Sequence, residues 1–201
     1  MSVKPAAVYD PVAKAFHWGI ALLVLIILVT AGFIETPQWL VDDQLRKTIF
    51  IIHKTAGFLV LPLTLARLVW RSVQIPPPLP IKKMPLWQVI AAIFTHRSLY
   101  VLSILTPLAG WALVSTTHKG LVLFGFIPMP SLPFLHPYMA SIDIVRSFFA
   151  SLHETFAILL ASLIVIHIGA SFMHHFVDRD DILLRIAPKG MEGFLKKIRG
   201  R

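Results

Sequence analysis

The stretch SLHETFAILLASLIVIHIGASFMHHF, residues 151–176, combines the composition of a membrane span with four histidines. From Thr155 onward it contains no Asp, Glu, Lys or Arg, and about 20 apolar residues are enough for a helix to cross a bilayer. The histidines are His153, His167, His174 and His175. Because lipid solvates ionisable side chains poorly, histidines within a span are candidates for a functional site.

The composition of the whole chain also indicates a membrane protein. Of its 201 residues 56% are hydrophobic and only 14% are charged, whereas soluble domains carry about 25% charged residues. The net charge of +9 does not indicate a nucleic-acid-binding protein, because the chain is too apolar for one. The chain has no cysteine, which excludes disulfides, cysteine-ligated zinc, iron–sulfur clusters and covalent attachment of haem.

Four segments are long and apolar enough to cross a bilayer. They are residues 15–34, 48–70, 98–117 and 152–176. The sequence therefore predicts an all-α membrane protein, with residues 1–201 forming one transmembrane four-helix bundle. Most Lys and Arg residues lie at the two termini and in the second connection, so the positive-inside rule predicts that both termini are cytoplasmic.

The spacing of two histidines in the last span predicts a pair of sites. His153 and His167 are 14 residues apart, which corresponds to about 21 Å along a helix and a rotation that returns to within about 40°. Both imidazoles therefore face the same neighbours at two depths, where other spans offer His53 and His17. Two facing imidazoles are the axial ligands that a b-type haem needs, so we expect two haem b groups, held by His53 with His153 and by His17 with His167.

His174 competes with His167 for the inner position, and simple matching of depth to His17 slightly favours His174. However, His153 and His174 are 21 residues apart, which is about 32 Å along a helix. This separation exceeds the hydrocarbon thickness of about 30 Å. We therefore expect His167 to be the ligand, and His174 and His175 to lie at the inner surface.

Further residues near the inner ends of the spans have two interpretations each. Arg67 and Arg71 suit pairing with haem propionates, or they anchor the span by the positive-inside rule. His96 lines a quinone or propionate site, or it caps a helix. Small residues that would let a macrocycle or a neighbouring helix approach closely are Gly19, Gly57, Gly110 and Gly169.

Three segments outside the spans carry expectations of their own. Residues 84–95 are expected to form an interfacial helix that leads into the third span. Residues 118–150 are apolar and rich in proline, so we expect them to pack over the outer mouth of the bundle. The basic stretch KGMEGFLKKIRGR, residues 189–201, is interpreted as an anchor beside anionic lipid rather than as a partner-binding helix.

The spans resemble those of the bacterial cytochrome b561 family. The stretches FHWGIALLVL, IIHKTAGFLVLPLTLARLVWR, HRSLYVLSILTPLAGW and the opening stretch each resemble one span, in the order found in the family. The resemblance covers about residues 9–188 and implies a four-helix bundle in which His17, His53, His153 and His167 bind two b haems. The six-span eukaryotic proteins of the same name are different, so ascorbate is not assumed to be the donor.

The resemblance implies electron transfer in the bacterial cytoplasmic (inner) membrane. Some similar proteins oxidise superoxide at the outer side and reduce ubiquinone, and others are cytochrome b subunits of hydrogenases or dehydrogenases. We expect an oxidoreductase that passes electrons from an outer-face donor, with superoxide as the leading candidate, to ubiquinone. The alternative is an electron-transfer subunit that anchors a redox partner protein. Lys54 and Lys119 would attract a small anion to the outer haem, although a solvated loop face explains them better.

Overall fold

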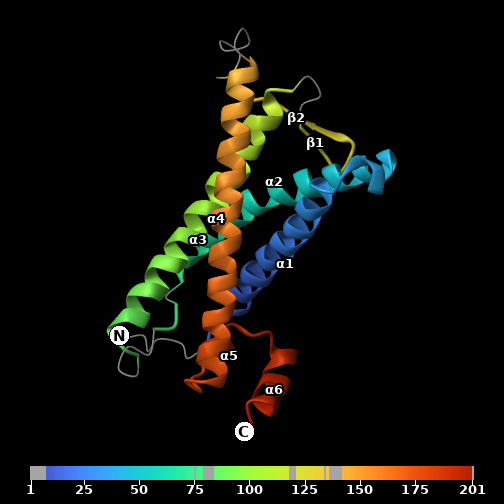
Figure 1. The fold of residues 1–201 in the computed structure, drawn as a ribbon. Coiled ribbons are helices and arrows are strands. Elements are labelled where there is room, and N and C mark those ends of the chain that lie inside the picture. Colours follow the sequence, from blue (N-terminus) through green and yellow to red (C-terminus); the bar gives the residue numbers. More distant parts are fainter. Residues whose placement is uncertain are drawn as a thin grey trace.

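Four long helices form the molecule in the computed structural model, which describes residues 8–74, 76–78, 84–117, 121–133, 135 and 142–200. They are α1 (Pro11–Ile34), α2 (Asp43–Val73), α3 (Leu86–Ser115) and α4 (Ile142–Phe176), as Figure 1 shows. Each is long and apolar enough to cross a membrane. The chain is thus an all-α, multi-pass membrane protein with a four-helix bundle, and the predicted fold class is confirmed.

The helix boundaries follow local sequence signals. Asp10 accepts hydrogen bonds from the N–H groups of Val12 and Ala13, so it caps α1, and Asp42 caps α2 in the same way. The helix α3 begins directly after Pro85, so the helical segment expected to lead into the third span is the first part of α3 itself. Residues 86–95 contain neither glycine nor proline, so nothing in them interrupts the helix that continues into the third span.

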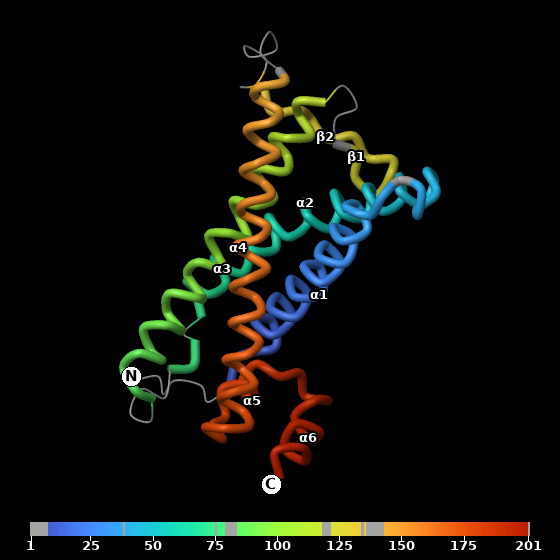
Figure 2. Tube along the Cα trace, viewed as in Figure 1, coloured from blue at the N-terminus to red at the C-terminus, as the bar shows by residue number. Residues whose placement is uncertain are grey.

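The helices pack as two antiparallel pairs, α1 with α2 and α3 with α4, and α2 also packs against α3. The trace in Figure 2 follows the chain through these pairs. A buried apolar cluster of Ile20, Val24 and Val60 joins α1 to α2, and Ile164 of α4 packs against it. Many apolar side chains on the outer faces are exposed, as lipid-facing positions require.

A short hairpin covers one end of the bundle, which we call the outer end. It consists of β1 (Leu121–Leu123) and β2 (Ile127–Met129), which are antiparallel. The N–H of Phe124 donates to Thr55 Oγ1 of α2 at 2.9 Å, and the indole of Trp111 in α3 donates to the carbonyl of Pro130 at 3.1 Å. Residues 121–130 therefore pack over the helix ends, as the sequence predicts, whereas residues 142–150 are not part of this cover but form the first turns of α4. A short 3-10 helix, η1 (Gln38–Leu40), lies in the connection between α1 and α2.

Two short helices, α5 (Ile182–Ile186) and α6 (Lys189–Ile198), lie at the opposite end, which we call the inner end (Figure 1). The indole of Trp18 donates to the carbonyl of Ile186 at 2.9 Å, and Lys14 Nζ donates to the carbonyl of Ala187 at 2.7 Å. The start of α1 and the C-terminal helices therefore lie at the same end. That this end faces the cytoplasm stays a prediction.

Candidate cofactor site

Two histidines from different helices face each other near the outer end. The ring centroids of His53 on α2 and His153 on α4 are 6.4 Å apart, and the rings are nearly perpendicular at 81°. The Nδ1 of His53 lies 3.0 Å from Thr30 Oγ1. The Thr30 hydroxyl donates to the α1 backbone, where the carbonyls of Ile26 and Ile27 lie at 2.8 and 2.9 Å. Its oxygen therefore accepts from His53 Nδ1–H.

His153 is held by the backbone of α3. Its Nδ1 donates to the carbonyl of Thr106 at 2.9 Å. A Cβ atom at Gly110 would lie only 2.9 Å from His153 Cε1 and 3.0 Å from its Nδ1. Glycine at this position is therefore what allows the imidazole to lie against the helix.

The two hydrogen bonds determine which nitrogen of each outer imidazole is available. Because Nδ1 of both His53 and His153 acts as the N–H donor, Nε2 of a neutral ring carries the free lone pair. Histidines that bind metals almost always donate their other ring N–H to a carbonyl, carboxylate or water, which fixes the tautomer and the ring orientation. The outer pair has this arrangement before any ligand is considered.

A second pair lies toward the inner end. The ring centroids of His17 on α1 and His167 on α4 are 6.2 Å apart, with an interplanar angle of 68°. The edge of His96, on α3, packs on His167 with 5.1 Å between centroids, and Trp18 packs on His17 at 5.5 Å. The Nδ1 of His17 is buried and has no hydrogen-bond partner among the residues that the structure describes.

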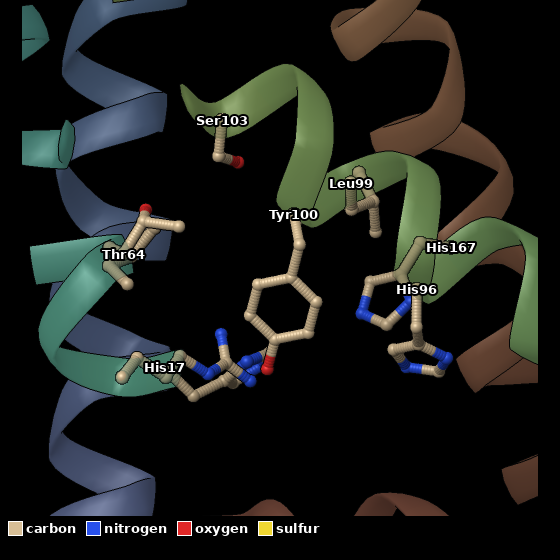
Figure 3. A pocket seen from close by; sticks show the side chains of 9 residues that line it. His17, Thr64, His96, Leu99, Tyr100, Ser103 and His167 are labelled. Atoms are coloured by element: carbon tan, nitrogen blue, oxygen red, sulfur yellow. The ribbon is translucent and has the colours of Figure 1, made fainter. Parts of the chain in front are cut away.

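A cavity adjoins the inner pair (Figure 3). Its volume is about 60 Å³, and its lining residues are His17, Ile20, Thr64, Arg67, His96, Leu99, Tyr100, Ser103 and His167. The guanidinium of Arg67 lies 5.4 Å from the centroid of the Tyr100 ring. The hydroxyl of Thr64 is buried and, within the described part of the chain, lacks a hydrogen-bond partner. Unpaired buried polar atoms call for a ligand, an ion or water.

The predicted inner-end residues occupy different places. Arg67 and His96 both line the cavity, and the exposed side chain of His96 donates from Nδ1 to the carbonyl of Ala92 at 2.7 Å. Arg71 is exposed on the last turn of α2 and is not among the lining residues of the described cavity. Arg67 is therefore better placed than Arg71 to pair with an anionic group bound there.

Both ring separations would suit one metal ion held between the two imidazoles of a pair. A metal–imidazole bond of about 2.0–2.1 Å plus about 1.1 Å from nitrogen to ring centroid, counted on both sides, gives about 6.3 Å. The observed separations are 6.2 and 6.4 Å. The donor sets would thus suit haem b, held by His53 with His153 and by His17 with His167.

A bare metal ion fits these pairs less well. Structural zinc sites use four protein ligands and catalytic sites use three. Within the described ranges, the one group of three or more His, Cys, Asp or Glu side chains close enough to share an ion is His174, Asp178 and Asp180, which lies elsewhere. Neither His17 with His167 nor His53 with His153 belongs to such a group.

His174 and His175 are committed to local contacts at the inner end. The Nδ1 of His174 donates to Asp180 Oδ2 at 2.8 Å and lies 3.1 Å from Asp178 Oδ2. His175 is fully buried, and its Nε2 donates to the carbonyl of Leu195 at 3.0 Å. The ring that contacts His17 belongs to His167 rather than to His174. This arrangement favours His167 as the inner partner.

Other predicted residues are less informative. Lys54 follows His53 on α2 and is half-buried. Lys119, together with His118 and His136, lies outside the described residues. Sequence reasoning missed Thr30 and Thr106, which orient the outer imidazoles, and Tyr100, which lines the inner cavity. Among the glycines, Gly110 gave a usable signal of close approach, although its neighbour is an imidazole.

Comparison with known proteins gives a consistent result. The sequence model of prokaryotic cytochrome b561 matches residues 8–189. "Cytochrome b561 homolog 1" of Escherichia coli is 28% identical over 183 residues, covering 86% of this chain and 93% of that protein. "Cytochrome b561 homolog 2" of the same organism is 26% identical over 190 residues, covering 92% and 94%. "Probable superoxide oxidase CybB" of Yersinia pestis is 26% identical over 185 residues, covering 90% and 96%.

Proposed function

This chain belongs to the prokaryotic cytochrome b561 family of haem b-binding electron-transfer membrane proteins, and we propose that it is a di-haem b oxidoreductase linked to ubiquinone. The observation that carries the proposal is the occurrence of two facing histidine pairs, separated by 6.2 and 6.4 Å, that share helix α4. One pair lies near each end of the bundle, so the two sites bridge the two sides of the bilayer.

The residues of the chain have separate roles in this proposal. His53 and His153 hold the outer group, and His17 and His167 hold the inner one. Arg67 supplies a fixed positive charge beside the inner pair, where it suits a propionate. Bound haem b supplies reversible one-electron chemistry. The apolar cluster of Ile20, Val24 and Val60 excludes water between the two levels.

We assign the donor and acceptor by chemistry and by the relatives. The similarity to a probable superoxide oxidase supports superoxide as the donor at the outer end. The reaction balances when two superoxide ions each lose one electron to become dioxygen, and ubiquinone takes up these two electrons and two protons to become ubiquinol. The relatives are bacterial, and the placement of basic residues supports an inner-membrane protein with its inner end in the cytoplasm.

The test is quinone reduction by the purified protein in lipid nanodiscs while superoxide is generated enzymatically. We expect a reducible b-type spectrum, about two haems per chain, as two His–His pairs require, and ubiquinol formation that added superoxide dismutase abolishes. Ubiquinol formation that is insensitive to dismutase would remove superoxide as donor. A folded, active preparation without haem would refute the whole proposal.

The alternative is an electron-transfer subunit that anchors a hydrogenase or dehydrogenase. It is supported by large apolar side chains exposed at the outer end, with Trp39 at 81%, Phe126 at 75% and Phe124 at 52% of their full exposure. Mild solubilisation followed by co-purification separates the two proposals. A stable redox partner bound through the hairpin favours the subunit, whereas an isolated chain with dismutase-sensitive quinone reduction favours the enzyme.

A further inference from the structure

The C-terminal helix α6 presents an apolar stripe that the bundle does not cover. Met191, Phe194 and Ile198 are exposed at 40%, 62% and 44%. Their spacing of three and four residues places them on one face of the helix. The neighbouring Leu195 is buried at 6% and packs against Leu184 and Ala187 of the preceding segment. The helix therefore uses one edge of its apolar face for the fold and leaves the rest outside.

The other face of α6 is basic. Lys189, Lys196 and Lys197 are exposed, and the acidic residue of the first turn, Glu192, pairs with Lys14 at 3.3 Å. The charge that Glu192 contributes is therefore offset within the protein, and the lysines leave a net positive face. A helix with an apolar stripe and a lysine-rich face is typical of the surface of anionic membranes.

The structure holds α6 in place at the inner end. Buried His175 donates to the carbonyl of Leu195 at 3.0 Å, and Arg199, just after the helix, donates to Asp181 Oδ1 at 3.0 Å. Lys14 of α1 donates to the carbonyl of Ala187 directly before α6. These contacts fix α6 at the inner end of the molecule, next to the ends of α1 and α4 (Figure 1).

We propose that α6 is a binding site for anionic phospholipid, in which Met191, Phe194 and Ile198 insert among acyl chains and the lysines pair with headgroup phosphates. Lipid suits this surface better than a protein partner does. Three apolar side chains form a patch far smaller than the roughly 800 Å² that each partner buries in a stable protein interface. The four candidate spans also place the chain in a membrane, so lipid headgroups are available near its inner end. The proposal is independent of the redox function.

The absence of cysteine from the chain makes a direct test practical. A spin label at Phe194→Cys reports on the apolar stripe, and one at Gly193→Cys reports on the opposite side of the same helix. A Cβ at Gly193 meets no atom within 4 Å, so this position tolerates a side chain. The full-length protein is placed in nanodiscs of phosphatidylcholine, alone or with increasing phosphatidylglycerol. We expect the label at position 194 to become accessible to lipid-soluble oxygen as phosphatidylglycerol is added, while the label at position 193 stays in water.

The lysines are tested in the Phe194→Cys background. Lys196→Ala or Lys197→Ala should each lower the equilibrium constant for insertion at a fixed phosphatidylglycerol content by about fivefold, and Lys47→Ala, an exposed lysine on α2 at the outer end, should leave it unchanged. Circular dichroism checks that each variant is folded. A label that stays in water in every nanodisc overturns the proposal, and so does insertion that ignores lipid charge. Dipolar coupling between labels on two chains would instead identify a second copy as the occupant and likewise overturn it.

Discussion

The outer and inner histidine pairs have almost the same ring separation, 6.4 and 6.2 Å, but reach it in different ways. Neutral groups of neighbouring helices orient the outer rings: the Thr30 hydroxyl holds His53, and the Thr106 carbonyl holds His153. The inner rings pack against aromatic edges, and His17 Nδ1 is left without a partner in the described structure. The same ligand spacing is thus compatible with two kinds of support.

The surroundings of the two pairs differ in charge as well as in support. Arg67 lines the cavity beside His17 and His167, whereas the hydrogen-bond partners of the outer rings are neutral. A nearby positive charge disfavours the more positive, oxidised state of a bound iron. The comparison therefore predicts an outer site that depends on ring orientation and an inner site whose potential depends on charge.

Replacing one ligand of each pair should have the largest effect. We expect His153→Ala to lose the outer haem and His167→Ala to lose the inner one, so that each variant binds about one haem instead of two. The haem content per folded protein, measured by the pyridine haemochrome method, tests this prediction. Redox titration of the remaining haem shows which site each variant keeps.

His174→Ala is the matched control on the same helix. Because His174 pairs with Asp178 and Asp180, its replacement should leave both haems in place. If His174→Ala lost the inner haem while His167→Ala kept it, the assignment of the inner pair would be reversed.

Gly110→Ala should damage the outer site alone. The added Cβ would lie 2.9 Å from His153 Cε1, so the ring must shift, and we expect its hydrogen bond to the Thr106 carbonyl to weaken. We expect loss or altered spectra of the outer haem with an intact inner haem, by low-temperature absorption and redox titration. Gly32→Ala, where a Cβ meets nothing within 4 Å, should change neither haem. An unchanged outer haem in Gly110→Ala would show that α3 does not orient His153.

The comparison of the outer and inner pairs also shows which features could be predicted from the sequence. The spans follow from composition, and the pairing of His53 with His153 and of His17 with His167 follows from helical periodicity, because both depend on regular geometry along one chain. The ring contacts of 6.2 and 6.4 Å agree with that pairing. Residues 86–95 are helical and lead into the third span, as predicted, but they are the continuous first turns of α3. That this part of α3 lies at the membrane surface stays a prediction.

The residues that orient the rings could not be predicted from the sequence. Thr30 and His53 lie on different helices, and their contact depends on how far α1 slides and rotates against α2. The acceptor at Thr106 is a backbone carbonyl, which every residue has, so the residue type does not indicate this contact. The order of the spans does not specify such interhelical registers, which depend on the packing of many side chains.

Thr30→Val should lower the affinity of the outer site for haem, but by less than His153→Ala or Gly110→Ala does. Valine keeps the shape of threonine but removes the oxygen that accepts from His53 Nδ1 at 3.0 Å. Loss of such an outer partner typically costs about 10–100-fold in metal affinity, so we expect faster loss of the outer haem to apomyoglobin and an unchanged inner haem. Thr48→Val removes a hydroxyl that bonds only its own helix, at the carbonyl of Gln44, and should have no effect. Equal haem loss in the two variants would contradict the role of Thr30.

Arg67→Gln should change the midpoint potential of the inner haem without causing loss of that haem. Removing the cation favours the oxidised state, so the midpoint potential of the inner haem should fall, on the order of tens of millivolts, with little change at the outer haem. Arg71→Gln should have a smaller effect, because Arg71 is exposed and solvent screens its charge. Spectroelectrochemical titration measures both potentials. Equal shifts of the two haems would show that the charge difference between the sites has another origin.

The smallest expected effect is on the acid dependence of stability, and it concerns the helix-capping carboxylates at the two ends of the bundle. Burial alone would raise the pKa of Asp10 at the inner end, but hydrogen bonds from the Ala13 N–H, the Trp70 indole and the Val12 N–H lower that pKa below its usual 3.8. At the outer end, the N–H groups of Gln44 and Leu45 lower the pKa of Asp42. A carboxyl whose pKa is lower in the folded state stabilises the protein above its unfolded pKa, and this stabilisation is lost as the pH falls through the folded value.

Acidification from pH 5 toward pH 2 should therefore loosen both caps, and the inner one more. Asp10 also accepts from the indole of Trp70 at 3.1 Å, which ties α1 to the end of α2, whereas the hydrogen bonds of Asp42 stay within its own helix start. Asparagine still caps a helix but does not ionise, so Asp10→Asn should flatten the acid dependence of the thermal midpoint more than Asp42→Asn does. For Asp10 the difference should be about 1 kcal/mol or less, since a whole cap contributes roughly that amount. Circular dichroism melts in detergent across this pH range measure it, and an equal response of the two variants would show that the Trp70 contact adds nothing.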